Sequence, residues 1–172
     1  MNNTRLYLRT TPSSVPPWLA LILWIALCAA TGAIGAIASV NAAEFYALLD
    51  KPTWAPPAKV FGPVWTLLYI SMAVAAWLVW RERGWTRAGG ALGLFVAQLA
   101  LNSLWSWLFF AWHRGPLALA DILALLGLIV ATMAAFARVR ALAAWLLVPY
   151  LAWVCFATAL NYSVWQRNPL LL

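Results

Sequence analysis

Long apolar stretches separated by short charged connectors organise this chain. Four of them contain no charged residue, namely 18–43, 61–80, 88–112 and 141–166. The fifth, 117–137, contains only Asp121. A helix needs about 20 apolar residues to cross the hydrocarbon core of a bilayer, and each stretch reaches or approaches that length. The pattern therefore predicts five spans, at about 18–40, 63–80, 88–110, 117–137 and 141–165.

These spans are predicted to be helices. A β-barrel strand alternates apolar and polar residues, whereas the run 119–126 reads LADILALL and does not alternate. Hydrophobic residues make up 66% of the chain and charged residues 9%, so little is left for a soluble domain. We expect an all-α membrane protein, a single five-helix bundle over 18–168, preceded by a mobile polar tail at 1–17.

The first connector, residues 41–62, is long and rich in proline. It contains a candidate short amphipathic helix at 44–50, followed by the segment KPTWAPP at 51–57. Its three prolines prevent a helix from continuing. A loop of this length in a compact chain is predicted to act as a lid. The other connectors are short, which favours antiparallel neighbouring helices.

The net charge of +7 indicates membrane topology rather than nucleic-acid binding, because the basic residues lie in the tail and connectors. One side is predicted to hold Arg5, Arg9, Arg81, Arg83, Arg87, Arg138 and Arg140. The other side would hold Lys51, Lys59, Arg114 and Arg167. This bias predicts a cytoplasmic N-terminus. The first apolar run is longer than a signal-peptide core, so we expect it to remain as a span. A bacterial inner membrane is favoured, with an organelle's outer membrane as the alternative.

Few polar side chains lie within the spans, and they share faces with aromatic residues. At helical spacing the third span aligns Gln98, Asn102, Trp105 and Phe109. The fifth span aligns Trp153, Ala157, Leu160 and Asn161. The second span aligns Trp65, Tyr69 and Met72. Such faces predict a pocket for a flat, largely apolar ligand. The alternative is that the three amides only bond neighbouring helices.

Classical catalytic and metal-binding patterns are absent from the sequence. His113 is the only histidine, and Cys28 and Cys155 both lie within apolar spans as expected of buried small residues. Asp121 is expected near the interface, paired with Arg114; a role in a proton relay is the alternative. We therefore expect no metal, no resident cofactor and no catalytic residue.

Two further patterns concern contacts with other molecules. Gly89, Gly93 and Ala97 recur every four residues, which favours close helix packing either inside the bundle or at a homodimer seam. Leu160, Tyr162 and Arg167 fit a weak pattern proposed for cholesterol contact, although an interfacial aromatic anchor explains them equally well.

The chain contains 13 tryptophans, more than interfacial belts alone require. Six fit such belts at span ends: Trp18, Trp80, Trp85, Trp112, Trp145 and Trp165. We expect ligand contact from three others, because Trp54 lies in the proline-rich loop and Trp105 and Trp153 lie within spans.

Several of these segments resemble the TspO/MBR family, which comprises the tryptophan-rich sensory proteins and the mitochondrial translocator proteins. The similar segments read KPTWAPP at 51–57, GPVWTLLY at 62–69, QLALN at 98–102, PYLAW at 149–153, and FAT and LNY at 156–158 and 160–162. The resemblance covers about 18–168, with all five spans in order.

This resemblance implies a five-helix protein, commonly a homodimer, that binds porphyrins, cholesterol and benzodiazepine-type drugs in a pocket under the first loop. Carried over, Trp54 caps the pocket, Trp153 and Ala157 line it, and Asn102 and Tyr69 point inward. Leu160 and Tyr162 fall in the family's cholesterol-recognition segment. Animal members carry a tryptophan near the start of the fourth span, where this chain has Leu117. That difference predicts reduced affinity for the classical drugs.

Three functions fit this implication. The first is a receptor or transporter-like protein for protoporphyrin IX and related tetrapyrroles. The second is an enzyme that degrades porphyrin in light, as reported for some family members, with Trp54 and Trp153 as redox partners. The third is a stress sensor that acts through a partner protein. We favour the first, with a tetrapyrrole, porphyrin or haem, as a ligand and not as a resident cofactor. Contacts with membrane lipid and with a sterol are also expected, and nucleic acid is excluded.

Overall fold

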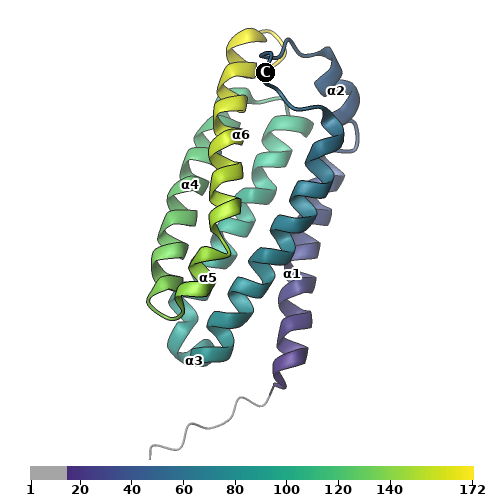
Figure 1. The fold of residues 1–172 in the computed structure, drawn as a ribbon. Coiled ribbons are helices and arrows are strands. Elements are labelled where there is room, and N and C mark those ends of the chain that lie inside the picture. Colours follow the sequence, from purple (N-terminus) through teal and green to yellow (C-terminus); the bar gives the residue numbers. More distant parts are fainter. Residues whose placement is uncertain (1–14) are drawn as a thin grey trace, which may run out of the picture.

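The computed structural model describes residues 15–172 and shows a bundle of helices that run along a common axis (Figure 1). Its elements are α1 (Pro17–Ala38), α2 (Ala42–Leu48), the 3₁₀ turn η1 (Ala58–Val60), α3 (Phe61–Ser106), the π-helical turn η2 (Trp107–Ala111), α4 (Gly115–Ala137), α5 (Ala141–Trp145) and α6 (Val148–Arg167). The described residues contain no strand. Of the predicted tail, residues 1–14 lie outside the described part.

The helix α3 contains two spans. Its 46 residues, extended further by η2, would make a straight rod about twice as long as a bilayer's hydrocarbon core is thick. The backbone at Gly84 leaves the helical region, with φ 64° and ψ 179°, and the chain reverses there (Figure 1). Residues 61–83 therefore form the second span and residues 85–111 the third.

Five crossings follow from this reversal. Four helical segments are long and apolar enough to cross a membrane, and one of these, Ala58–Ala111, holds the two spans of α3. The predicted five-helix membrane bundle is thereby confirmed. The fifth span consists of α5 and α6, which are separated at Leu146 and Leu147, just before Pro149 in the first turn of α6, a residue without a backbone N–H. The Ser71 hydroxyl donates to the Leu146 carbonyl at 2.7 Å and so satisfies an acceptor at this break.

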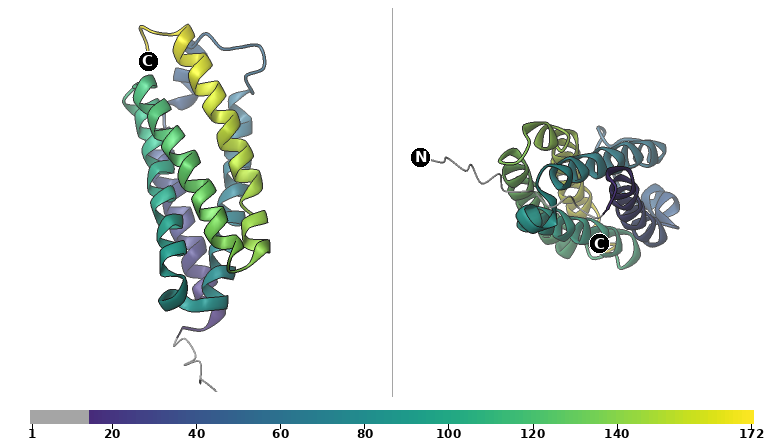
Figure 2. Two further views of the ribbon diagram at one scale, coloured as in Figure 1. Left: turned by 90° about the vertical axis from the view of Figure 1, so that its left-hand side faces the viewer. Right: turned by 90° about the horizontal axis from the view of Figure 1, so that it is seen from below.

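The basic connectors segregate to the two ends of the bundle as the charge pattern predicts. Near the Gly84 reversal, the Arg83 guanidinium donates to the Arg138 carbonyl at 3.1 Å, and Arg140 pairs with Glu82 at 3.4 Å. These contacts join the α3 reversal to the α4–α5 turn. The opposite end carries α2, the first connector and the C-terminus (Figures 1 and 2). Arg5 and Arg9 lie outside the described residues.

The core is built from small residues on α3 and large ones around them. Ala73, Ala76 and Val79 are fully buried, and alanine lets neighbouring helices approach closely. Phe95 stacks on Phe136 of α4 with ring centroids 5.9 Å apart. The outer surface is also apolar, as expected of a bundle that faces lipid; its exposed residues include Ile22, Leu23, Ile37, Leu67, Leu123 and Val130.

Candidate functional site

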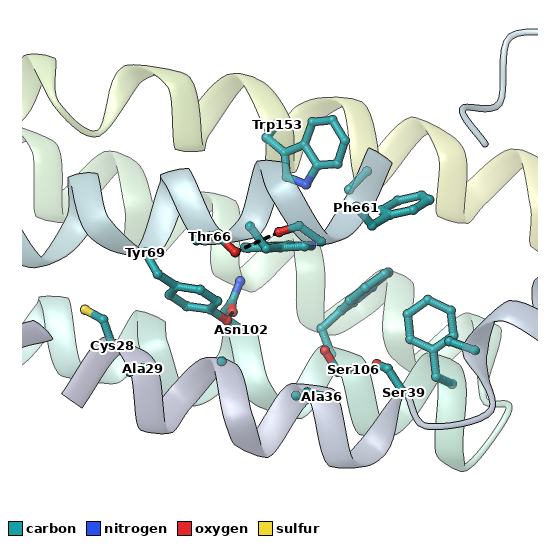
Figure 3. A pocket seen from close by; sticks show the side chains of 18 of the residues that line it. Cys28, Ala29, Ala36, Ser39, Phe61, Thr66, Tyr69, Asn102, Ser106 and Trp153 are labelled. Atoms are coloured by element: carbon teal, nitrogen blue, oxygen red, sulfur yellow. Dashed lines mark hydrogen bonds between the residues drawn. The ribbon is translucent and has the colours of Figure 1, made fainter. Parts of the chain in front are cut away.

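A cavity of about 630 Å³ lies in the half of the bundle that is nearer the first connector. Its walls come from α1, both spans of α3 and α6, and the far end is marked by Cys28 (Figure 3). The first connector covers the other end, where Ala42 and Tyr46 of α2 and Ala58 of η1 contribute to the lining. We call residues 42–60 the roof segment. This volume is within the range of small-molecule binding sites.

The cavity is apolar apart from a few neutral hydrogen-bonding groups. Besides its tyrosines and tryptophans, the polar residues of its lining are Ser39, Thr66, Asn102 and Ser106. Among residues 15–172, no Asp, Glu, Lys or Arg contributes to the lining. An ionised group buried here would lack a counter-charge, so the chemistry of the walls favours uncharged, hydrophobic ligands or ligand parts.

Three hydrogen-bonded side chains form a buried polar array on one wall. The Tyr69 hydroxyl donates to Asn102 Oδ1 at 2.6 Å, and Asn102 Nδ2 donates to the Tyr150 hydroxyl at 3.3 Å. The array thus joins the second, third and fifth spans. A primary amide has two N–H donors and two acceptor positions. Asn102 therefore keeps one N–H and one lone pair that a ligand in the cavity can use.

Aromatic rings supply most of the remaining surface. Trp65 packs beside Tyr69 with centroids 5.5 Å apart, and Trp153 meets the edge of Phe61 at 5.9 Å. Trp105 meets Phe110 edge to face with centroids 5.7 Å apart, and both rings line the cavity. These rings come from three spans and the start of α3, so they present flat apolar surfaces on several sides of one space.

Small residues on α1 make room opposite the aromatic wall. A Cβ added at Gly32 would lie 3.0 Å from Tyr69 Cε2, and one at Gly35 would lie 3.2 Å from Ser106 Oγ. Larger side chains at these positions would collide with Tyr69 or Ser106. In the sequence this stretch is marked only by a run of mostly small residues at 29–36, which indicates close helix packing but does not by itself indicate a cavity.

The structure brings five of the predicted ligand-binding residues together. Tyr69, Asn102, Trp105, Trp153 and Ala157 all line the cavity. Their assignment as ligand contacts remains a prediction. Sequence reasoning missed Ser106, although it follows Asn102 by four residues on the same helical face, and it missed Gly32, whose only signal was the small-residue run.

Gln98 and Asn161 lie outside the cavity lining. Gln98 Nε2 approaches Met72 Sδ at 3.9 Å, while its buried Oε1 has no hydrogen-bond partner in the described part of the chain. Asn161 Oδ1 accepts a hydrogen bond from Trp105 Nε1 at 3.0 Å, and its Nδ2 donates to the Gly115 carbonyl at 3.3 Å. Asn161 thus corresponds to the helix-bonding alternative, and it orients a tryptophan of the cavity wall.

Trp54 and Leu160 also lie apart from the lining. Trp54 is 49% exposed and contacts the edge of Phe156 at 5.7 Å, and Phe156 packs on Trp153 at 5.5 Å. One ring therefore separates Trp54 from the cavity wall. Leu160 is buried in a separate hydrophobic cluster with Tyr46 and other residues beneath the roof segment. Contact of either residue with a ligand stays a prediction.

The structure also places the small-residue stripe Gly89, Gly93 and Ala97 and the residues of the proposed cholesterol pattern. Gly93 and Ala97 are exposed, and a Cβ at Gly89 or Gly93 would meet no atom within 4 Å. The stripe therefore faces outward from the bundle, which leaves the homodimer seam as the alternative to test. Tyr162 is exposed, while Arg167 pairs with Asp50 at 3.5 Å.

The expected pairing of Asp121 with Arg114 is wrong. Asp121 is buried on α4, and its Oδ2 has no hydrogen-bond partner within the described residues. Arg114 is the residue that precedes α4 and is exposed. The two lie on one face by spacing, but the helix begins at Gly115, so Arg114 does not belong to the helical repeat. Residues 15–172 contain no cluster of His, Cys, Asp and Glu that could hold a metal ion.

Internal bonds shape the roof segment. Lys51 Nζ donates to the carbonyls of Tyr46 at 2.6 Å and Leu49 at 2.7 Å, and so caps the end of α2. The Tyr46 hydroxyl donates to the Pro56 carbonyl at 3.1 Å. Burial raises the pKa of this phenol above its ordinary value, so it remains a donor at neutral pH. Its contribution is complete below a pH of about 10 and is lost as pH rises through the raised pKa.

Sequence reasoning also missed Asn168, which lies directly after α6. Its amide bonds the backbone of Asp50 in the roof segment, through Oδ1 and Nδ2, at 2.9 Å each. It is buried, with 7% of its surface exposed. No signal in the sequence identifies this contact, because it joins residues that are 118 positions apart.

Comparison with known proteins gives a consistent result. The TspO/MBR family profile matches residues 8–166. Over 127 residues the chain is 47% identical to the Translocator protein of Homo sapiens, covering 73% of this chain and 75% of the relative. It is 45% identical over 154 residues to the Tryptophan-rich protein TspO of Chlorobaculum tepidum, covering 88% and 97%. The Tryptophan-rich sensory protein of Cereibacter sphaeroides is 38% identical over 151 residues, covering 88% and 92%.

Proposed function

Because this chain belongs to the TspO/MBR family of membrane proteins, we propose that it is a receptor for porphyrins such as protoporphyrin IX. The observation that carries the proposal is the cavity of about 630 Å³, whose walls are aromatic and contain no charged residue. A flat, conjugated and mostly apolar macrocycle matches such walls in size and chemistry. Sterols and benzodiazepine-type compounds share part of that chemistry and are secondary candidate ligands.

In this proposal, the rings of Trp105 and Trp153 stack against or edge onto the macrocycle. Asn102 offers its free N–H and lone pair to a polar atom of the ligand, since its other positions are held by Tyr69 and Tyr150. The propionates of a porphyrin would stay outside the uncharged cavity, because burying an unpaired carboxylate is costly. They would lie at the roof end, where Lys59 is exposed.

Quenching of tryptophan fluorescence by protoporphyrin IX tests the proposal in purified protein. We expect saturable quenching in the wild type, and an affinity about 3- to 10-fold lower in Trp153→Leu, because a packed aromatic contact is lost. Trp145→Leu is the matched control, since Trp145 is 70% exposed and does not line the cavity. Equal affinities for wild type and Trp153→Leu, or no quenching at high micromolar porphyrin, would contradict the proposal.

A light-dependent enzyme is the second candidate. It is favoured by the three indole rings that line the cavity, those of Trp65, Trp105 and Trp153. Trp54 is separated from Trp153 by a single ring, that of Phe156. This candidate requires loss of the porphyrin absorption band under illumination, and a loss of that activity in Trp54→Phe. A receptor without turnover leaves the band unchanged.

A further inference from the structure

The roof segment lies at the end of the bundle that carries the C-terminus (Figure 1). Ala42, Tyr46 and Ala58 of this segment line the cavity. The part between α2 and η1 lies away from the lining, yet it connects the two elements that close the cavity. A ligand that enters from water at this end has to displace the roof segment.

Asn168 holds this connecting part from the outside. Its Oδ1 accepts from the Asp50 N–H at 2.9 Å, and its Nδ2 donates both to the Asp50 carbonyl at 2.9 Å and to the Val164 carbonyl at 2.8 Å. The side chain therefore makes the same pair of bonds to Asp50 that a neighbouring β-strand would make. Its anchor on Val164 fixes the amide to the end of α6. Because the amide is buried, water competes poorly for these bonds.

Other attachments of the roof segment are of a different kind. Within residues 15–172, the hydrogen bonds that reach from the roof segment to the end of α6 come from Asn168 and from Arg167. The Arg167–Asp50 pair is long, at 3.5 Å, and its side chains are 47% and 65% exposed, so it contributes little. The remaining contacts are apolar. Tyr46 and Leu49 are buried in a cluster that includes Leu160 of α6. Phe45 stacks on His113 and Trp54 meets the edge of Phe156, and none of these contacts has a fixed hydrogen-bond geometry.

We propose that Asn168 is a latch, a positioning residue that keeps the roof segment closed and so sets the rate at which molecules pass between the aqueous phase and the cavity. Opening requires Asp50 to exchange two buried hydrogen bonds for bonds to water. The latch proposal depends on the proposed porphyrin receptor function only for the identity of the ligand. Access to the cavity can be measured without any ligand.

Cys28 reports on access, because it lines the end of the cavity far from the roof segment and is 1% exposed (Figure 3). The experiment uses the full chain in lipid nanodiscs with Cys155→Ser, and a negatively charged methanethiosulfonate reagent that enters hydrocarbon poorly. We expect slow modification of Cys28 in this background. Asn168→Ala is expected to accelerate it by about tenfold or more, since three hydrogen bonds are lost. Arg167→Ala is expected to change the rate by less than about twofold.

A control separates opening of the roof from general loosening of the bundle. Val79 is fully buried in the core and does not line the cavity. In a Val79→Cys variant that lacks Cys28 and Cys155, Asn168→Ala should leave the modification rate of the new thiol unchanged. Equal acceleration at both positions would assign Asn168 a structural role in α6 and overturn the latch. An unchanged Cys28 rate in folded Asn168→Ala would overturn it as well.

Porphyrin kinetics provide the second readout. A latch that controls passage raises the association and dissociation rate constants together, so Asn168→Ala should change both by a similar factor and leave the dissociation constant nearly constant. A dissociation constant that changes as much as the rates would contradict gating. If porphyrin does not bind the wild type, the proposed function fails, while the result with Cys28 still decides the proposal about Asn168.

Discussion

At the scale of single residues, the cavity depends on the absence of side chains at Gly32 and Gly35 of α1 as much as on the aromatic rings. Gly32 faces Tyr69, whose hydroxyl donates to Asn102 at 2.6 Å. The distance from an added Cβ to Tyr69 Cε2 would be 3.0 Å, closer than ordinary van der Waals contact. The ring of Tyr69 is held between its neighbour Trp65 and the buried array, so it cannot move without weakening that array.

We therefore expect Gly32→Ala to displace the Tyr69 ring, to break the Tyr69–Asn102 hydrogen bond and to weaken porphyrin binding by about 2- to 10-fold. Gly127→Ala on α4 is the matched control, because a Cβ there would meet nothing within 4 Å. Fluorescence titration of the two variants measures the difference. Wild-type affinity in Gly32→Ala would show that the position of Tyr69 does not matter for the ligand.

At the scale of elements, the reversal within α3 decides how many times the chain crosses the membrane. Gly84 adopts φ 64° and ψ 179°, a conformation that is essentially limited to glycine. Arg83 and Glu82, directly before it, bind the α4–α5 turn through Arg138 and Arg140. One residue thus permits the turn, and its neighbours attach the turn to the next connector.

Gly84→Ala is expected to destabilise the folded bundle by about 1–3 kcal/mol, because alanine is strained in that conformation. The thermal midpoint followed by circular dichroism in detergent should fall. Gly90→Ala serves as the control, since Gly90 is exposed in a regular part of α3 with open space around it. It should be neutral or slightly stabilising, because alanine favours helix. A midpoint for Gly84→Ala equal to that of Gly90→Ala would refute the argument from backbone strain.

The elements also show which features a sequence can predict. Charge-free stretches of about 20 residues indicate helical spans because lipid forces every backbone group to be bonded within the helix. Spacing by four placed Asn102 and Gln98 on one face, yet only Asn102 lines the cavity, since Gln98 packs near Met72. Helical periodicity predicts which side of a helix a residue occupies. It does not predict at which level along the helix the neighbouring helices separate and leave a cavity.

The contacts of the roof segment could not be predicted from the sequence, for a different reason. Trp54 was expected at the cavity, but a proline-rich loop has no periodicity that fixes where its side chains point. Asn168 lies 118 residues from its partner Asp50, and asparagine after a helix is common without such a contact. Similarly, the Asp121–Arg114 pair was inferred from spacing along a helix that begins only after Arg114.

At the scale of the whole molecule, the fold combines a tightly packed half with a hollow half. Alanines of α3 and the stacked pair Phe95 and Phe136 fill the end near the Gly84 reversal. Toward the other end, glycines on α1 face aromatic residues of α3 and α6, and the space between them remains open. The roof segment covers one end of the hollow half. This division agrees with the receptor role proposed above.

Protection of Cys28 from alkylation tests whether a porphyrin occupies this cavity. With Cys155→Ser, Cys28 is the only thiol in the chain, and it lines the cavity. We expect saturating protoporphyrin IX to slow alkylation of Cys28 by N-ethylmaleimide at least about tenfold, with half-protection at the concentration that gives half-maximal quenching. Alkylation at the unprotected rate while quenching is complete would place the porphyrin elsewhere and contradict the account.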